Sequence, residues 1–73
     1  MEMTIYIAVG NTFPAKEALK KAGFTWEPVA KEWQGNEAAK AEIERITRPA
    51  YGRLYSKMME KGNVKIIAKE IDA

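Results

Sequence analysis

The sequence contains no cysteine and no histidine. Without cysteine there is no disulfide framework and no thiolate nucleophile, so the fold must be held by packing alone and suits a reducing compartment. Without histidine the chain lacks the most common general base and the most common metal ligand. Ser56 is the only serine and Asp72 the only aspartate, so few groups are left for catalysis. We expect a protein that is not an enzyme and that binds no metal or cofactor.

Long apolar segments are also absent. No stretch approaches the roughly 20 apolar residues of a membrane span, and the opening MEMTIYIAVG lacks the basic start and the length of a signal peptide. The 73 residues, of which 47% are hydrophobic and 30% charged, predict one globular domain over residues 1–73 with one small core. We expect a cytoplasmic protein, in the host cytoplasm if it is phage-encoded, that is a monomer or small homo-oligomer and does not contact a membrane.

The first half of the chain has the clearest local signals. Residues 3–9 alternate in hydrophobicity with the two-residue period of a strand that has one face on the core. A helix is predicted from about residue 14 to residue 22, because Thr12 is placed to cap it and Gly23 suits its end. Its predicted buried stripe comprises Ala15, Ala18, Leu19 and Ala22.

Two tryptophans follow this helix, on the predicted arms of an antiparallel hairpin. Phe24 and Trp26 precede a loop at Pro28, and Trp33 follows it. Both tryptophans are expected in the core, because so small a domain has little other bulk. The alternative is that they form a stacking platform for nucleic-acid bases.

The second half predicts two helices and a strand. Asn36 is placed to cap the first helix, which should stop near Thr47 or kink there, because Pro49 disfavours helical geometry at Arg48. Its predicted buried stripe comprises Ala39, Ile43 and Ile46. A second helix is predicted over residues 49–61 and a last strand over residues 64–71. The packing face predicted for this second helix comprises Tyr51, Leu54, Tyr55 and Met58.

These elements predict an α+β fold in the order strand, helix, strand, strand, helix, helix, strand. The short strands and the hairpin favour a small, mainly antiparallel sheet with helices on one face. The order of the strands within the sheet does not follow from the pattern.

The central stretch GNTFPAKEALKKAGFTWEPVAKEW also carries a motif. Its positions are Thr12, Phe13, Pro14, Lys16, Leu19, Lys20, Gly23, Trp26, Pro28, Lys31 and Trp33. Over residues 10–34 the chain resembles a short module of phage and mobile-element proteins, which occurs alone or attached to DNA-processing enzymes. The resemblance implies a βαββ scaffold and a phage or plasmid setting, and it implies no particular function.

Positive charge gathers in the second half. The net charge is only +2, but residues 45–69 contain seven basic residues and one acidic residue, and such a local concentration attracts phosphate or an acidic partner. The predicted nucleic-acid or partner-binding residues are Arg45, Arg48, Tyr51, Arg53, Lys57, Lys61 and Lys65. The alternative is an ordinary solvated helix face, which is also the role expected for Lys16, Lys20 and Lys21.

Two binding functions are compatible with this sequence. In the first, a non-enzymatic phage or mobile-element protein binds nucleic acid through the basic C-terminal segment, without sequence preference because no base-reading motif is present. In the second, the protein is a small stoichiometric inhibitor of a host defence or DNA-processing complex, as an anti-CRISPR protein is. The expected partner is accordingly nucleic acid or a host nucleoprotein complex.

Overall fold

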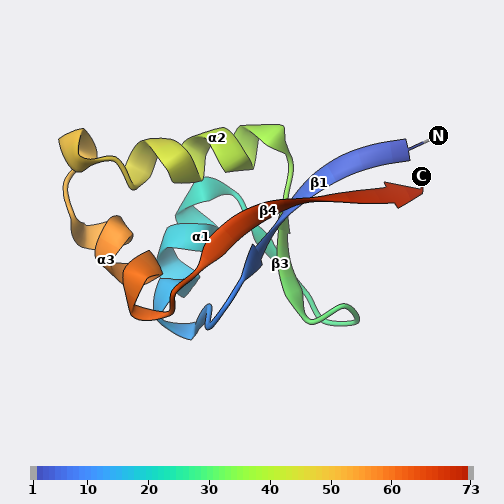
Figure 1. The fold of residues 1–73 in the computed structure, drawn as a ribbon, viewed down its shortest axis with the longest axis horizontal. Helices are drawn as coiled ribbons and strands as arrows, with labels where there is room; N and C mark the ends of the chain where they lie inside the picture. Colours follow the sequence, from blue (N-terminus) through green and yellow to red (C-terminus); the bar gives the residue numbers. More distant parts are fainter. Residues whose placement is uncertain (1, 73) are drawn as a thin grey trace.

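The computed structural model describes residues 2–72, which fold into one four-stranded antiparallel sheet with three α-helices on one face (Figure 1). The predicted α+β class and element order are confirmed. The elements are β1 (Glu2–Val9), a 3-10 turn (Phe13–Ala15), α1 (Lys16–Ala22), β2 (Thr25–Glu27), β3 (Glu32–Gly35), α2 (Glu37–Ile46), a second 3-10 turn (Pro49–Tyr51), α3 (Leu54–Lys61) and β4 (Lys65–Asp72).

The sheet has the strand order β2-β3-β1-β4. β1 and β4 pair along their whole length, from Glu2 opposite Asp72 to Val9 opposite Lys65. β3 pairs with β1 only near Tyr6, Ile7 and Ala8, and β2 forms the far edge. The β1–β4 ribbon therefore runs on past the helices and carries both ends of the chain (Figure 1).

The helices pack on the face of the sheet that carries Tyr6 and Ala8. Directly opposed residues in neighbouring strands share a face, and on this face large residues meet small ones. Tyr6 lies opposite Gly35, and Ala8 lies opposite Trp33. A Cβ on Gly35 would stand only 2.8 Å from the Cβ of Ala39 in α2, so glycine at this position lets the helix approach the sheet closely.

The other face of the sheet, called here the open face, is not covered by any helix of the described residues. The same pairing rule places on it Met3, Ile5, Ile7, Val9, Ile67 and Ile71. Met3 and Ile67 are exposed, whereas Ile7 is buried. Ile7 lies on the central strand β1, between Gln34 of β3 and Ile67 of β4. An ion pair also spans this strand, because Lys69 of β4 reaches Glu32 of β3 with 2.7 Å between Nζ and Oε1.

Most of the predicted features of α1 and the turn before it are confirmed. The predicted stripe of Ala15, Ala18, Leu19 and Ala22 is buried. Gly23 adopts the left-handed conformation with φ of 103° and donates its N–H to the last turn, as a C-terminal glycine does. The predicted cap is wrong, because the Thr12 hydroxyl makes no capping hydrogen bond. The entry is instead a 3-10 turn in which the Thr12 carbonyl accepts from the N–H of Ala15 at 3.0 Å.

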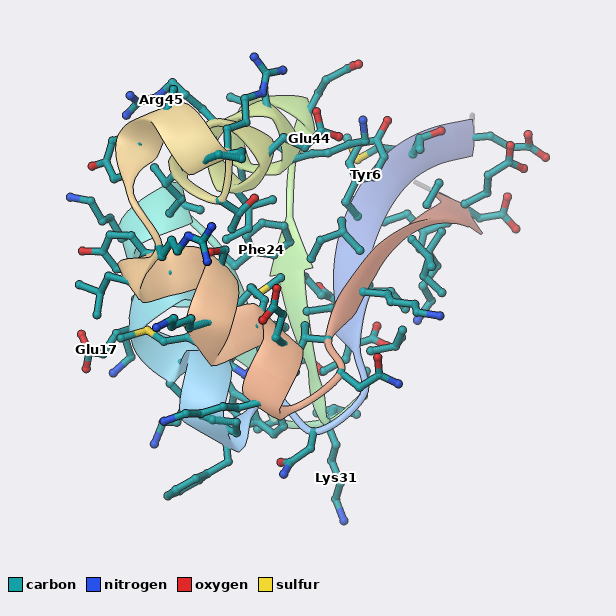
Figure 2. All side chains as sticks on the ribbon, turned by 60° about the vertical axis from the view of Figure 1, so that its left-hand side comes forward. Tyr6, Glu17, Phe24, Lys31, Glu44 and Arg45 are labelled. Carbon is teal, nitrogen blue, oxygen red and sulfur yellow. The ribbon has the colours of Figure 1, made fainter. Side chains whose placement is uncertain are left out.

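The prediction that both tryptophans lie in the core is confirmed for Trp33 and wrong for Trp26. Trp33 is 5% exposed and belongs to the core, but Trp26 is 48% exposed. The two are opposed in the β2–β3 register, and their rings meet edge to face with centroids 5.8 Å apart. Trp26 lies on the short edge strand β2, while Phe24 is 2% exposed and fills the space under the helices (Figure 2).

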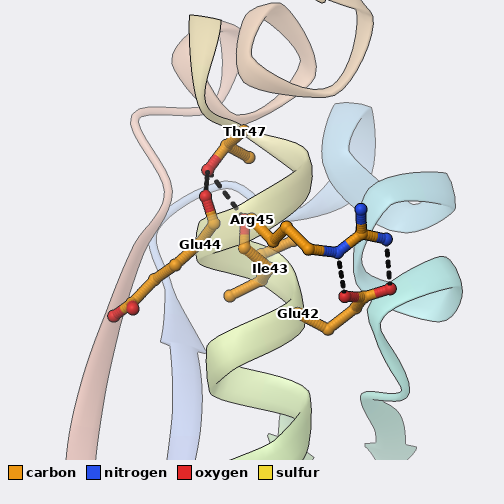
Figure 3. A network of polar contacts seen from close by, with 5 residues as sticks. All are labelled: Glu42, Ile43, Glu44, Arg45 and Thr47. Atoms are coloured by element: carbon orange, nitrogen blue, oxygen red, sulfur yellow. Dashed lines mark hydrogen bonds and ion pairs between the residues drawn. The ribbon is translucent and has the colours of Figure 1, made fainter. Parts of the chain in front are cut away.

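Helix α2 begins and ends as predicted. The Asn36 side chain accepts from the N–H of Ala39 at 2.9 Å, and the stripe Ala39, Ile43 and Ile46 is buried. At its end the Thr47 hydroxyl donates to the Ile43 carbonyl at 2.7 Å (Figure 3). Arg48 then becomes extended, with ψ of 148°, as a residue before proline tends to be.

The single helix predicted over residues 49–61 is wrong. A 3-10 turn over Pro49–Tyr51 is separated from α3 by Gly52, whose φ of 114° and ψ of 175° interrupt the helical path. Of the predicted packing face, Tyr55 and Met58 do pack against the core, together with Met59, whereas Tyr51 and Leu54 are exposed.

The Lys69–Glu32 pair predicts a pH-dependent contribution to stability. Hydrogen bonds from Lys69 and then from Gln34 lower the pKa of Glu32 below its ordinary 4.5. A carboxylate whose folded pKa is lowered stabilises the fold above its unfolded pKa, and this contribution is lost as the pH falls through the folded pKa. Lys69→Gln should therefore lower the urea midpoint at pH 7, and the difference from wild type should shrink as the pH drops below 4.5.

Urea titrations followed by circular dichroism at a series of pH values measure this effect. Lys65→Gln is the matched control, because Lys65 lies on the same strand and the described residues include no ion pair to it. A Lys69→Gln deficit that is the same at all pH values would show that the packing of the lysine stem matters rather than the ion pair.

Candidate nucleic-acid interface

An open groove of about 620 Å³ lies between the β1–α1 connection and the β2–β3 hairpin. Its lining residues all belong to the first half of the chain. Its lining residues are Ala8, Gly10, Asn11, Thr12, Phe13, Lys16, Lys20, Trp26, Lys31, Glu32 and Trp33. Seven of the eleven motif residues are among them: Thr12, Phe13, Lys16, Lys20, Trp26, Lys31 and Trp33. Residues that are scattered along the motif are thus brought to one place by the fold.

Two aromatic rings of the groove are accessible to solvent. Phe13 is 75% exposed and Trp26 is 48% exposed, whereas Trp33 is buried between the groove and the core. The Trp26 ring rests against the ring of Trp33. The backbone at Phe13 is held by a hydrogen bond from its N–H to the Asn11 side chain at 3.3 Å, and the next residue, Pro14, has a fixed φ.

Three lysines share the groove with these rings. Lys16 and Lys20 are one helical turn apart, so they project from the same side of α1, and Lys31 stands at the end of the hairpin loop, pointing away from the body of the protein (Figure 2). Lys31 adopts a left-handed conformation with φ of 56°. The Lys16 Nζ lies 5.2 Å from the centre of the Phe13 ring, so charge and aromatic surface are interleaved.

Glu32 is the one carboxylate among the residues that line the groove. Its side chain is engaged by Lys69 and by Gln34, whose Nε2 donates to the same oxygen at 2.8 Å. These partners lie on the open face of the sheet, opposite to the face of Trp33 and Ala8. The carboxylate is therefore directed away from Lys16, Lys20 and Lys31, and the groove keeps a net positive charge.

The groove also adjoins the end of the basic segment. The N–H of Asn11 donates to the carbonyl of Gly62 at 3.0 Å, so the β1–α1 connection rests on the turn that follows Lys61. Lys65 lies opposite Val9, one residue before groove residue Gly10. Two of the predicted site residues are thus next to the loop that borders the groove.

The other predicted site residues lie between the last turn of α2 and the middle of α3. Arg53 and Lys57 line a shallow hollow of about 270 Å³ together with Thr47, Pro49, Ser56 and Glu60. Arg48 lies at the start of this connection. The basic residues of segment 45–69 are therefore spread over the surface from α2 to β4 and do not form one pocket.

Arg45 and Tyr51 have structural partners. The Arg45 guanidinium donates twice to the Glu42 carboxylate, at 2.6 and 2.9 Å (Figure 3), and lies 5.0 Å from the centre of the Tyr51 ring. The hydrogen bond to Glu42 raises the pKa of Arg45 above its ordinary value. These contacts hold the 3-10 turn against α2, so both side chains are less available to a ligand than the other predicted residues.

The groove was not predicted from the sequence. The pattern of α1 predicts Lys16 and Lys20 on a solvated helix face, and the pattern of the hairpin predicts Trp26 in the core, but neither pattern shows that the two elements meet. The signal that pointed to them was the motif itself, in which lysines and aromatic residues recur at fixed spacings. Only the chain reversal at Gly23 brings the helix and the hairpin to the same place.

No family model, no curated protein and no solved structure matches this chain. Within residues 2–72, the helices are too short or too polar to cross a lipid bilayer.

Proposed function

We propose that this protein binds nucleic acid without catalysing a reaction, in the phage or mobile-element setting that its motif resembles. The observation that carries the proposal is the groove beside the β1–α1 connection, in which Lys16, Lys20 and Lys31 lie together with two exposed aromatic rings. Lys61 adjoins the turn on which this connection rests, whereas Lys65, opposite Val9, belongs to the open face.

The phosphate backbone is the ligand that suits this arrangement. Closely placed lysines repel one another, and neutralising phosphates releases counterions, which makes binding favourable and salt-dependent. The lysine ammonium is a point charge on a flexible stem, so it follows a backbone without demanding one geometry. Because phosphate contacts carry no sequence information, we expect binding with little sequence preference.

Two charge-removal variants test the proposal. The groove variant is Lys16→Gln/Lys20→Gln/Lys31→Gln, and the α3 variant is Arg53→Gln/Lys57→Gln/Lys61→Gln. Each phosphate contact that is lost should lower the slope of log affinity against log salt by about 0.7 to 0.9. We expect the larger decrease for the groove variant, measured by fluorescence anisotropy of a labelled oligonucleotide at several salt concentrations.

A third variant controls for net charge. Lys21→Gln/Lys40→Gln/Arg45→Gln removes the same charge outside the groove, from residues that contact Tyr55, Glu44 and Glu42. Its salt slope should remain that of the wild type. If it weakens binding as much as the groove variant does, the attraction is a property of overall charge, and the proposed site is wrong.

A stoichiometric inhibitor of a host defence or DNA-processing complex, of the anti-CRISPR type, is the second candidate. The open face favours it, because Met3 and Ile67 are exposed there beside other apolar residues, and contiguous apolar surface marks sites of protein contact. Affinity capture from host lysate with and without nuclease separates the two functions. A partner retained after nuclease treatment supports the inhibitor, and one lost with the nucleic acid supports direct binding to it.

A further inference from the structure

The groove contains a feature that phosphate binding does not require. Phe13 is 75% exposed and Trp26 is 48% exposed, and both line the same groove as the lysines. Single exposed apolar residues are common on protein surfaces. Two aromatic rings beside three lysines in one concavity are a different case, because rings and charges then meet the same ligand.

The Trp26 ring is positioned before any ligand arrives. Trp33 is buried and holds Trp26 edge to face, with the ring planes 64° apart. At Phe13 the backbone is held, by the hydrogen bond from its N–H to the Asn11 side chain and by the following Pro14. A base that stacks on Trp26 therefore meets a ring that is already ordered, which lowers the entropic cost of binding.

The ligand must present both negative charge and a planar apolar face. In a duplex the base faces are already stacked on their neighbours, so a duplex would contact the lysines and leave the rings in water. In a single strand the bases are free to stack on aromatic side chains, and every base has such a face. An apolar peptide would use the rings but would leave the lysine charges without partners.

We infer that this groove takes an unpaired base together with its neighbouring phosphates, so that the protein binds single-stranded nucleic acid in preference to duplex. The inference rests on the proposed function and adds the class of nucleic acid to it. Trp26 and Phe13 supply stacking surfaces, and Lys16, Lys20 and Lys31 contact the backbone on either side. The groove volume of about 620 Å³ falls within the roughly 300 to 1,000 Å³ of sites that enclose small molecules, which is room for one nucleotide.

The experiment compares three oligonucleotides of equal length: a single strand, the corresponding duplex, and a single strand with abasic sites along its centre. Wild type, Trp26→Ala and Phe13→Ala are titrated with each by fluorescence anisotropy. Val29→Ala is the matched control, because Val29 is an exposed apolar residue of the same hairpin that does not line the groove. Circular dichroism confirms that each variant is folded.

We expect wild type to bind the single strand roughly tenfold or more tightly than the abasic strand, since one stacked base contributes on that scale. Trp26→Ala should weaken binding to the single strand by roughly tenfold to a hundredfold and leave binding to the abasic strand unchanged. Phe13→Ala, which removes a side chain that is largely in solvent, should act in the same direction and keeps the test valid if Trp26→Ala does not fold. Val29→Ala should bind as wild type does.

Equal affinity of wild type for single strand and duplex, or unchanged single-strand binding by both aromatic variants, would overturn the inference and leave the proposed function standing. Failure of wild type to bind any of the three oligonucleotides at near-physiological salt would instead overturn the proposed function itself.

Discussion

Trp33→Ala is expected to unfold the protein or to reduce its free energy of unfolding by about 3 to 5 kcal/mol, whereas Trp26→Ala leaves it folded. The two residues are the same amino acid, directly opposed on one hairpin. Trp33 is 5% exposed and packs in the core, while Trp26 is 48% exposed. Removing the buried ring leaves a cavity under the helices, and removing the other opens space that water already reaches.

The size of the domain makes this loss severe. A chain of 73 residues has a total stability on the order of 4 to 11 kcal/mol by per-residue averages, so losing Trp33 removes much of it. Urea denaturation followed by far-UV circular dichroism is the suitable measurement, because it does not depend on tryptophan fluorescence. Equal destabilisation by the two substitutions would contradict the observed difference in burial.

Gly62→Ala should have the second large effect, and it should act on stability and binding together. A Cβ at this position would overlap the carbonyl oxygen of Asn11, and Asn11 is one of the residues that line the groove. The φ of Gly62 is −98°, which any residue can adopt, so the expected cost is steric. Relieving the clash must displace the β1–α1 connection or the turn after α3, at a cost of about 3 kcal/mol.

Gly52→Ala is the informative comparison. Gly52 has φ of 114° but no atom within 4 Å of the place where its Cβ would stand, so this substitution carries backbone strain without a clash. It should destabilise the protein by roughly 1 kcal/mol or more and leave oligonucleotide affinity unchanged, because the site is remote from the groove. Gly62→Ala should lower both the urea midpoint and the affinity. Wild-type values for Gly62→Ala in both measurements would show that the close approach at Asn11 is not required.

Trp33 and Gly62 both support the groove. The groove depends on Trp33 for the support of Trp26 and on Gly62 for the path of the connection that carries Asn11 and Phe13. The basic segment, residues 45–69, carries no motif. It adjoins the groove through the hydrogen bond between Asn11 and Gly62. Residues near the C-terminus thus shape a groove whose lining comes from the N-terminal half.

The sequence by itself determined the features that depend on near neighbours in the chain. Gly23 ends α1 in a left-handed conformation, Asn36 caps α2 and Arg48 leaves the helix before Pro49. The alanine stripe of α1 is buried because its spacing matches the helical repeat. In each case the controlling interaction spans at most a few residues, so the local pattern is sufficient.

The tertiary structure decided everything that depends on which elements meet. Trp26 and Trp33 have the same local setting, and only the position of β2 at the edge of the sheet exposes one and not the other. Residues 49–61 have helical periodicity that Gly52 interrupts, and it is the packing of α3 that decides that Tyr55 and Met58 contact the core while Leu54 does not. The groove arises from contacts between residues far apart in sequence, such as Asn11 with Gly62, and such long-range closures leave no periodic signal along the chain.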